Sequence, residues 1–169
     1  MTELLPDQTI DADRFRRTLA LHAAGVVVVT AAPGGVPAGL TATSFTSVSL
    51  EPPLVSFCIA RTSTTWPSLR AADRFAINIL SDAQADLAAR FAHRGIDRFA
   101  APTRWHPAPD GTPLLEGVCA HLLCSPYTTA DIGDHVLVVG LVTEAHIREP
   151  DQPLLYHRGR FGRFRPQTS

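Results

Sequence analysis

Residues 26–30 read Val-Val-Val-Val-Thr, a run in which every side chain is β-branched. Such side chains lose rotamer freedom in a helix but pack well on a pleated sheet, so the run predicts a strand. Because apolar residues occupy consecutive positions instead of alternate ones, both faces of this strand are expected to be buried. The chain must therefore build a sheet that is covered on both sides.

The segments that follow continue the β pattern. The turn sequence PGGVPAG (33–39) predicts that residues 40–50 return as the antiparallel partner of the valine strand. Prolines at 52 and 53 separate this hairpin from the next strand, since they remove two donors from any ladder. Further strands are expected at 54–60, 75–80, 118–127, 135–147 and 154–156, with TTADIGD joining the two long ones.

Two helices are predicted from periodicity and end signals. The first spans about three turns within 11–25, where Phe15 and Leu19 share a face and Gly25 supplies the stop. The second runs over 83–92, after the capping-box spacing of Ser81 and Gln84. A shorter helix is expected within 61–74.

Residues 93–113 contain four prolines and two glycines and indicate a long surface excursion, of the kind that forms lids or interface arms. Five to seven mostly antiparallel strands with a few short helices predict a mainly β fold, a barrel or sandwich with helical decoration. At 169 residues the chain is expected to be one domain, with its core at about 15–161.

Composition excludes several function classes. A formal charge of −1 argues against nucleic-acid and membrane-surface partners. All 15 basic residues are Arg, which removes the lysine of Schiff-base chemistry and of phosphate-loop nucleotide hydrolases. Three cysteines without a CxxC pair indicate thiols in a reducing compartment, and the N-terminus resembles no signal peptide, so a cytoplasmic protein is expected.

The familiar catalytic motifs are missing from the sequence: GxSxG, HExxH, paired CxxC and GxGxxG do not occur. Cys119 and His121 share one face of a strand while Cys124 faces the other way, which leaves a metal site or a packed core as alternatives. Asp131 and Asp134 flank Gly133, where turn formation and acid–base catalysis are both conceivable. Metal binding is not predicted.

Six segments together resemble the flavin reductase-like family, the FMN-binding split-barrel proteins that serve as reductase components of two-component monooxygenases. The resemblance extends from about Phe15 to Phe161, and residues 36–60 carry most of its specificity. The segments are AAGVVVVTA, PAGLTATSFTSVSLEPPLVSFCIA, FAINIL, AARFA, GDHVLVVGLV and LLYHRGRF.

The resemblance implies a homodimeric antiparallel split β-barrel with two sets of binding residues. The flavin set is Gly39, Leu40, Thr41, Thr43, Ser44, Ile59, Ala60, Arg61, Ser63, Thr64, Asn78 and Phe91. Within it, residues 39–44 are expected at the ring and 59–64 at the ribityl and phosphate groups, where hydroxyls, loop amides and a guanidinium suit a phosphate. The nicotinamide set is His135, Tyr156, His157 and Arg158.

The implied activity is an NADH-dependent FMN reductase, with FAD and NADPH as alternative ligands. Hydride passes from the nicotinamide to the flavin, and reduced flavin diffuses to a separate monooxygenase. No catalytic acid or base is obligatory in this reaction, although His135 could orient the nicotinamide. A non-catalytic flavin-binding protein on the same barrel is the alternative, because a fold does not establish turnover.

Overall fold

The computed structural model describes residues 9–149 and 152–167. Within these ranges lie three α-helices, a short 3₁₀ turn at Pro33–Gly35 and twelve strands. The helices are α1 (Ala12–Leu19), α2 (Trp66–Arg70) and α3 (Ala85–Ala92). The strands are β1 (Ala24–Gly25), β2 (Val27–Ala31), β3 (Ala38–Ala42), β4 (Thr46–Leu50), β5 (Pro53–Ala60), β6 (Phe75–Ile79), β7 (Trp105–Pro107), β8 (Pro113–Leu115), β9 (Ala120–Ile132), β10 (His135–Ile147), β11 (Leu154–His157) and β12 (Arg160–Arg163).

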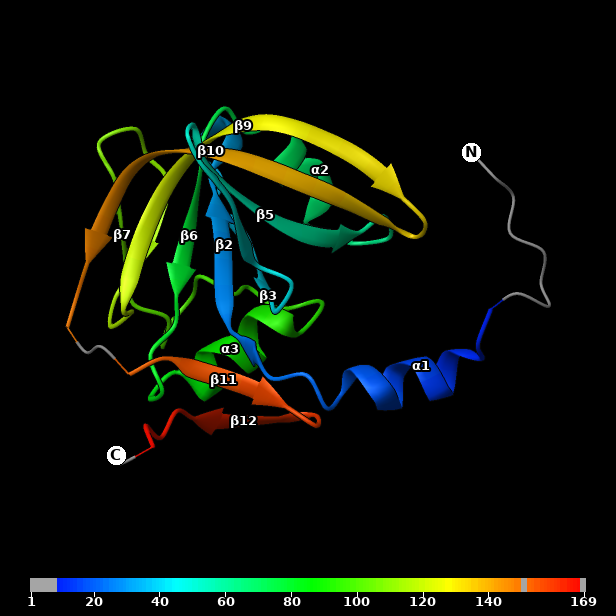
Figure 1. Ribbon diagram of the computed structural model, residues 1–169. Helices are drawn as coiled ribbons and strands as arrows, with labels where there is room; N and C mark the ends of the chain where they lie inside the picture. Colours follow the sequence, from blue (N-terminus) through cyan, green and yellow to red (C-terminus); the bar gives the residue numbers. More distant parts are fainter. Residues whose placement is uncertain (1–8, 150–151, 168–169) are drawn as a thin grey trace.

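The central feature is an antiparallel seven-stranded sheet in the order β3-β2-β6-β9-β10-β5-β4. Its two edge strands, β3 and β4, follow each other in the chain with only residues 43–45 between them, so the sheet has to bend back on itself (Figure 1). No ladder joins β3 to β4 among the described residues, and the barrel is therefore split. This arrangement confirms the predicted fold class.

The valine run is buried on both faces, as predicted. Val27 and Val29 pack inside the barrel with Phe57 and Ile77. Val26 and Val28 face outward into a second cluster that includes Phe91, Leu80 and Leu115. The second cluster lies between the sheet and α3, which covers one end of β2 and β3 (Figure 1). A β-branched run suits this place because it fills two cores at once.

The single strand predicted over 40–50 is wrong, because the chain forms two strands there with different partners. β3 pairs with β2, whereas β4 pairs with β5 at the opposite edge of the sheet. Between them, the Ser44 hydroxyl accepts a hydrogen bond from Cys58 N (2.9 Å) and donates one to Cys58 O (3.3 Å). Hydroxyl side chains compete in this way with the ladder for backbone groups, which ends one strand and starts the next.

The β9–β10 hairpin is longer than predicted. β9 continues through residues 128–132, which the sequence had placed in the connection, and the turn consists of Gly133 and Asp134. Gly133 adopts a φ of 60°, which a glycine tolerates without strain. The extended hairpin forms an arm that reaches out over α2 (Figure 1). Asp131 pairs with Val136 in this ladder, in keeping with a structural place for it.

A separate sheet, β1-β11-β12, lies beside α3 at the end of the molecule opposite the β9–β10 arm (Figure 1). From it α1 projects sideways, and none of its residues is buried. Asp11 caps the helix by accepting a hydrogen bond from Arg14 N at 2.8 Å. Over the described residues, no helix is long and apolar enough to cross a membrane.

Candidate functional site

A cavity of about 370 Å³ opens where β3, β5, the 61–64 loop and the end of α3 meet. Nine of the twelve residues predicted for flavin line it, and so does His135 from the nicotinamide set. The predicted flavin residues in the lining are Leu40, Thr41, Thr43, Ser44, Ile59, Ala60, Ser63, Thr64 and Phe91. The remaining lining residues are Ala42, Cys58, Ala92, Arg94 and Arg98, which the sequence analysis did not identify.

Hydroxyl groups in the cavity divide into those bonded to the protein and those left for a ligand. Thr41 Oγ1 donates to the carbonyl of Ala88 in α3 at 2.7 Å, and Ser44 bonds the backbone of β5. Thr43 and Thr64 are exposed, and their hydroxyls bond no other described residue. The second pair can therefore meet a ligand without breaking a contact of the fold.

Gly39 lies beside the cavity and is required by packing. A Cβ at this position would stand 2.8 Å from the Val29 carbonyl oxygen and 2.9 Å from Phe91 Cε1. The backbone of β3 can thus approach Phe91 only if residue 39 has no side chain. Phe91 is fully buried and stacks edge to face against Phe99, with ring centroids 5.2 Å apart.

Asn78 does not line the cavity, so the structure does not support its predicted contact with the flavin. The side chain is fully buried in the core. Its Nδ2 donates to Val28 O (2.9 Å) and Thr30 Oγ1 (3.0 Å), and its Oδ1 accepts from Leu115 N (2.9 Å). With all three bonds made inside the protein, Asn78 crosslinks β6 to β2 and β8.

Arg61 is exposed and its side chain does not line the cavity either. Its backbone N–H donates to the Asp134 carbonyl at 3.0 Å, which fixes the start of the 61–64 loop against the β9–β10 turn. The guanidinium groups in the lining come instead from Arg94 and Arg98, in the excursion that follows α3. The predicted contact of Arg61 with the ribityl and phosphate groups stays a prediction, and the arginines that line the cavity are Arg94 and Arg98.

Arg98 fastens the excursion to the barrel. Its Nη1 donates to the Gly39 carbonyl (2.6 Å) and to Thr65 Oγ1 (2.8 Å), while Nε and Nη2 donate to the His93 carbonyl (3.0 and 2.7 Å). Burial, together with the nearby charge of Arg94, lowers the pKa of Arg98 below its ordinary value. An arginine stays protonated nonetheless, so four of its five N–H groups serve the fold.

The excursion is also braced from α3. Arg90 Nη2 donates to the carbonyls of Asp97 (2.6 Å) and Ala100 (3.3 Å). The Asp97 carboxylate accepts from the backbone N–H groups of Phe99 (3.0 Å) and Ala100 (3.2 Å). Residues 93–103 thus form an ordered wall of the cavity. The sequence clue to this wall is the regular spacing of arginines at 90, 94 and 98 around Gly95. Secondary-structure propensity alone does not explain why these three positions are arginine.

His135 reaches the cavity from the start of β10, beside its register partner Ala60 on β5. Its Nδ1 lies 2.7 Å from Asp134 Oδ1. This hydrogen bond holds the pKa of the Asp134 carboxyl below its usual range. With Nδ1 bonded to Asp134, Nε2 is the ring nitrogen left for a ligand. The candidate nicotinamide side and the candidate flavin side therefore share one opening.

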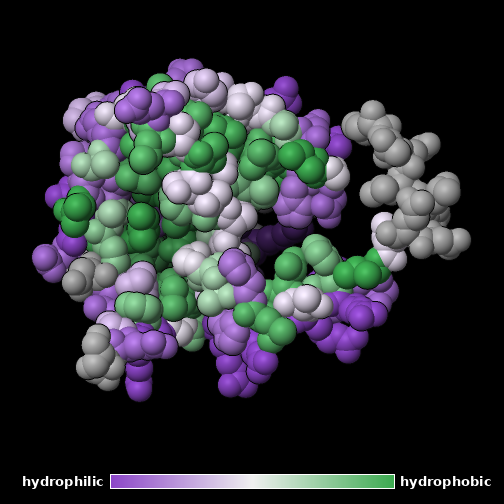
Figure 2. Space-filling view, viewed as in Figure 1, coloured by the Kyte–Doolittle hydropathy of each residue, from purple (hydrophilic) through white to green (hydrophobic). Residues whose placement is uncertain are grey.

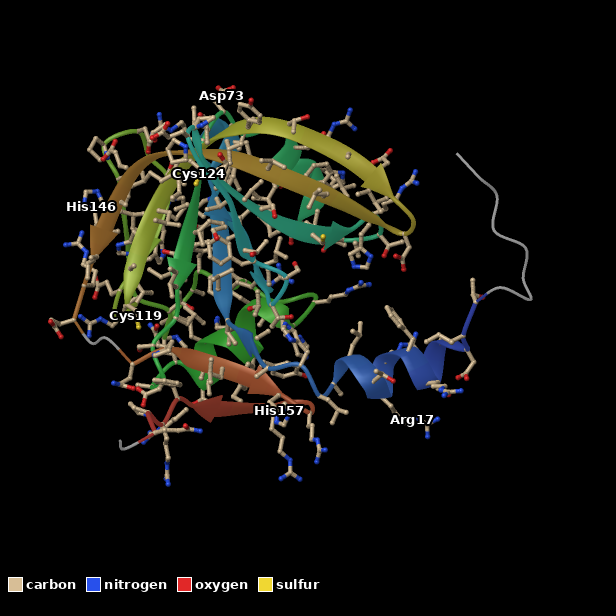
Figure 3. All side chains as sticks on the ribbon, in the orientation of Figure 1. Arg17, Asp73, Cys119, Cys124, His146 and His157 are labelled. Carbon is tan, nitrogen blue, oxygen red and sulfur yellow. The ribbon has the colours of Figure 1, made fainter. Side chains whose placement is uncertain are left out.

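Tyr156, His157 and Arg158 do not reach this opening. They belong to β11 and its turn, where Tyr156 pairs with Ala24 of β1 and Arg158 N donates to the Ala20 carbonyl at 3.0 Å. In Figure 3, His157 lies on the β11 sheet, on the side away from the barrel. Arg158 adopts a φ of 49°, a turn conformation set by the β11–β12 hairpin. Within one chain, the nicotinamide set is reduced to His135.

Two of the residues considered for a metal site, His121 and Cys124, lie in the core, and Cys119 is half-buried. His121 is buried and its Nε2 bonds the Leu115 carbonyl at 2.8 Å, while burial raises the pKa of the Cys124 thiol to about 12. Figure 3 shows Cys124 between the strands and Cys119 nearer the lower edge of the sheet. In the described ranges, no group of three or more His, Cys, Asp or Glu side chains could hold a metal ion.

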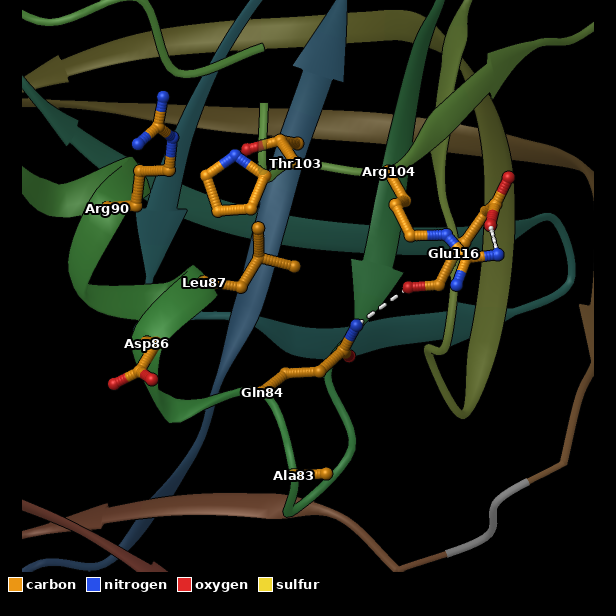
Figure 4. A pocket seen from close by; sticks show the side chains of 9 residues that line it. Ala83, Gln84, Asp86, Leu87, Arg90, Thr103, Arg104 and Glu116 are labelled. Carbon is orange, nitrogen blue, oxygen red and sulfur yellow. Dashed lines mark hydrogen bonds and ion pairs between the residues drawn. The ribbon is translucent and has the colours of Figure 1, made fainter. Parts of the chain in front are cut away.

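A second cavity of about 400 Å³ lies on another side of α3 (Figure 4). Its charged groups are largely paired within the protein. Arg104 bonds Glu116 at 2.7 Å, and Gln84 Nε2 donates to the Glu116 carbonyl at 2.7 Å. Arg90, on the same wall, is bonded to the excursion. The first cavity therefore has the groups available for a ligand, although it is slightly smaller.

Comparison with known proteins identifies the family of this chain. Residues 19–165 match the family model described as the flavin reductase like domain. The chain belongs to the flavin reductase-like family. This membership confirms the resemblance that the sequence motifs indicated.

Family members of similar length share the whole domain. The NADH:FMN oxidoreductase of Rhodococcus erythropolis is 45% identical over 161 residues, which cover 93% of this chain and 84% of that protein. The reductase subunit HsaB of a flavin-dependent monooxygenase from Rhodococcus jostii is 39% identical over 163 residues, covering 96% and 83%. The structure of the Streptomyces globisporus C-1027 NADH:FAD oxidoreductase in complex with NAD and FAD fragments has a TM-score of 0.88 and 35% identity, covering 99% of this chain and 100% of that one.

The donor set of the cavity fits a flavin. Leu40 and Ala60 contribute partly exposed apolar surface, the β3–β4 connection contributes small side chains, and Thr43 and Thr64 contribute free hydroxyls. Arg94 adds a positive charge, and none of the described lining residues is Asp or Glu. A flavin mononucleotide presents a flat ring, a hydroxylated chain and a phosphate, for which apolar surface, hydroxyls and a guanidinium are suitable partners.

Proposed function

We propose that this chain is an NADH-dependent flavin reductase that takes FMN and supplies reduced flavin to a separate monooxygenase. The observation that carries the proposal is the joint lining of one cavity by the flavin residues of β3 and β5 and by His135. Family membership and the NADH:FMN oxidoreductases among its relatives support it. FAD is an alternative flavin, since one structural relative is an NADH:FAD oxidoreductase, and NADPH stays the alternative hydride donor.

A bound flavin supplies the redox chemistry, because it accepts a hydride from a dihydronicotinamide. The residues of this chain bind and orient the two ligands. The partly exposed Leu40 and the β3–β4 connection would form the surface against which the flavin ring packs, and Thr43 and Thr64 would bond its polar edge and side chain. His135, held by Asp134, orients the nicotinamide through Nε2. No residue needs to take up or release a proton in this scheme.

A partner monooxygenase is part of the proposal. It is supported by the reductase subunits of flavin-dependent monooxygenases among the relatives of the chain. Reduced flavin would reach that enzyme by diffusion. We also place the protein in the cytoplasm, in keeping with a buried Cys124 that is a thiol.

We further propose a homodimer, for a reason that differs from the sequence argument. The excursion at 93–113 was expected to need a partner's cover, but Phe99 and Trp105 pack edge to face upon each other and extend the contact with Phe91. Exposed apolar side chains lie on α1, where Phe15 and Leu19 are 51% and 53% exposed. Figure 2 shows apolar side chains on the helix, which stands away from the barrel across a hollow. A second copy of the chain is the occupant we propose for this face.

The test of the function is anaerobic mixing of the protein with NADH and FMN while the flavin absorbance is followed. Rapid bleaching that depends on the protein is the expected result. Flavin binding without bleaching, with NADH and NADPH and with FMN, FAD and riboflavin, would instead identify a non-catalytic flavin-binding protein. The His135→Ala variant serves as the comparison, because it keeps the flavin residues and loses the proposed nicotinamide contact.

A further inference from the structure

Arg94 and Arg98 line the same cavity but differ in what their guanidinium groups already do. Arg98 donates to Gly39, Thr65 and His93, so most of its N–H groups are committed to the fold. Arg94 makes no hydrogen bond or ion pair through its guanidinium with any described residue, and it is exposed. The free positive charge of the cavity is therefore that of Arg94.

The position of Arg94 is fixed although its side chain is free. Its backbone carbonyl lies 2.8 Å from His93 Nδ1. The carbonyl of His93 accepts two of the four hydrogen bonds that the Arg98 guanidinium donates. The next residue, Gly95, has a φ of 76°, which lets the chain turn sharply at this point. The backbone at Arg94 is thus held in place, and only the side-chain torsions decide where its guanidinium lies.

The charge of Arg94 has no acidic neighbour in the cavity. The described lining contains no Asp or Glu, and the nearby Asp97 uses its carboxylate on the N–H groups of Phe99 and Ala100. The neighbouring charge is that of Arg98, which is also positive and whose pKa is lowered by burial and, to a smaller extent, by the charge of Arg94. An anion entering the cavity would relieve this unbalanced charge.

Ser63 and Thr64 line the same cavity and add hydroxyl groups to the guanidinium, whereas the Arg61 side chain lies outside the lining. We propose that Arg94 binds the phosphate of the flavin and so makes the protein prefer FMN over riboflavin. The inference rests on the proposed function, since it concerns the same cavity. A phosphate is the anionic group of FMN, and a guanidinium recognises it with two parallel hydrogen bonds.

The experiment measures binding of FMN and of riboflavin by quenching of flavin fluorescence, without NADH. For Arg94→Gln we expect FMN to bind about tenfold more weakly and riboflavin to bind within about twofold of the unaltered protein, as for loss of a charged hydrogen bond. Arg94→Lys should restore part of the FMN preference. The preference of the unaltered protein should also decrease with added salt, because the contact is partly exposed.

Two further variants each remove one positive charge at another arginine. The first is a matched control, and the second tests a competing assignment. Arg70→Gln, on exposed α2, should leave the FMN to riboflavin ratio unchanged. Arg61→Gln tests the competing assignment, in which the residue next to the 63–64 hydroxyls supplies the charge. Loss of the FMN preference in Arg61→Gln, with a normal preference in Arg94→Gln, would overturn the inference.

Other results separate this inference from the proposed function. Equal weakening of FMN and riboflavin in Arg94→Gln would mean that Arg94 shapes the cavity and binds no phosphate, which overturns the inference alone. A weaker affinity for NAD⁺ with unchanged FMN binding would assign Arg94 to the nicotinamide nucleotide, with the same consequence. If the unaltered protein bound none of the flavins, both the inference and the proposed function would be wrong.

Discussion

Arg98 Nη1 lies 2.6 Å from the carbonyl oxygen of Gly39, a residue 59 positions earlier in the chain. This contact joins the excursion after α3 to the edge strand β3, and the same nitrogen reaches Thr65 beside α2. Three segments that are distant in the sequence are thus held at one guanidinium. They form one side of the candidate flavin cavity.

For Arg98→Met we expect lower stability and weaker binding of FMN and riboflavin alike. The variant leaves the carbonyls of Gly39 and His93 without their donor, which costs on the order of 1–3 kcal/mol for a partly buried charged hydrogen bond network. Thermal unfolding and flavin fluorescence provide the two readouts. Arg94→Gln is the control, because its guanidinium bonds nothing in the fold and its melting temperature should not change. An Arg98→Met protein of normal stability would contradict the bracing role.

Thr41 in β3 and Thr43 in the β3–β4 connection both line the cavity, but their hydroxyls serve different purposes. Thr41→Val breaks the bond to Ala88 and should lower the free energy of unfolding by about 1 kcal/mol. Thr43→Val breaks no bond within the described structure, so it should keep the stability and weaken flavin binding several-fold. Denaturant titration and flavin binding on both variants distinguish the two effects. If Thr41→Val instead weakened flavin binding and Thr43→Val lowered the stability, Thr41 would be the residue that contacts the ligand.

His135→Ala should raise the KM for NADH more than the KM for FMN. The ring lies at the opening that the flavin residues share, and its Nε2 has no bond to the described protein. Asp134→Asn should produce a smaller change in the same direction, because the amide can still orient the ring but accepts a weaker hydrogen bond. Steady-state kinetics with each substrate varied in turn checks both. A change confined to the KM for FMN would place His135 on the flavin side.

His121 makes the stability of the fold depend on pH. Burial lowers the pKa of this imidazole in the folded protein, and its Nδ1 has no hydrogen-bond partner among the described residues. The unfolded chain then takes up a proton more readily than the folded one, so stability is full above about pH 6.5 and decreases as the pH falls below it. His121→Asn should reduce this acid sensitivity. Melting temperatures of both proteins between pH 5 and pH 8 provide the measurement.

Phe15→Asp combined with Leu19→Asp should convert the proposed dimer into a folded monomer. No residue of α1 is buried in the single chain, so the variant should retain the melting behaviour of the barrel apart from any contribution of the dimer. Sedimentation velocity at micromolar concentration reports the mass. The control is Ile147→Asp, which places one new negative charge on a 91% exposed apolar position of β10. A monomeric unaltered protein would disprove the dimer.

Local patterns predicted most of the strands because neighbouring residues determine them. The valine run appears as β2, residues 54–60 as β5, and 135–147 as β10 with the predicted bounds. The single strand over 40–50 failed because its break depends on Ser44 finding the backbone of Cys58, 14 positions later. Alternation within a segment carries no information about such a partner.

By itself the sequence determined the mainly β class, the buried valine strand, the family and the segments 40–44 and 59–64 that line the candidate flavin cavity. The tertiary structure alone decided which polar groups in those segments remain free. Asn78 makes its hydrogen bonds in the core, and the cavity lining includes Arg94 but not Arg61. The physical reason is that a side chain's availability depends on whichever donors and acceptors the fold brings to it. Those partners come from strands, helices and loops far away in the chain.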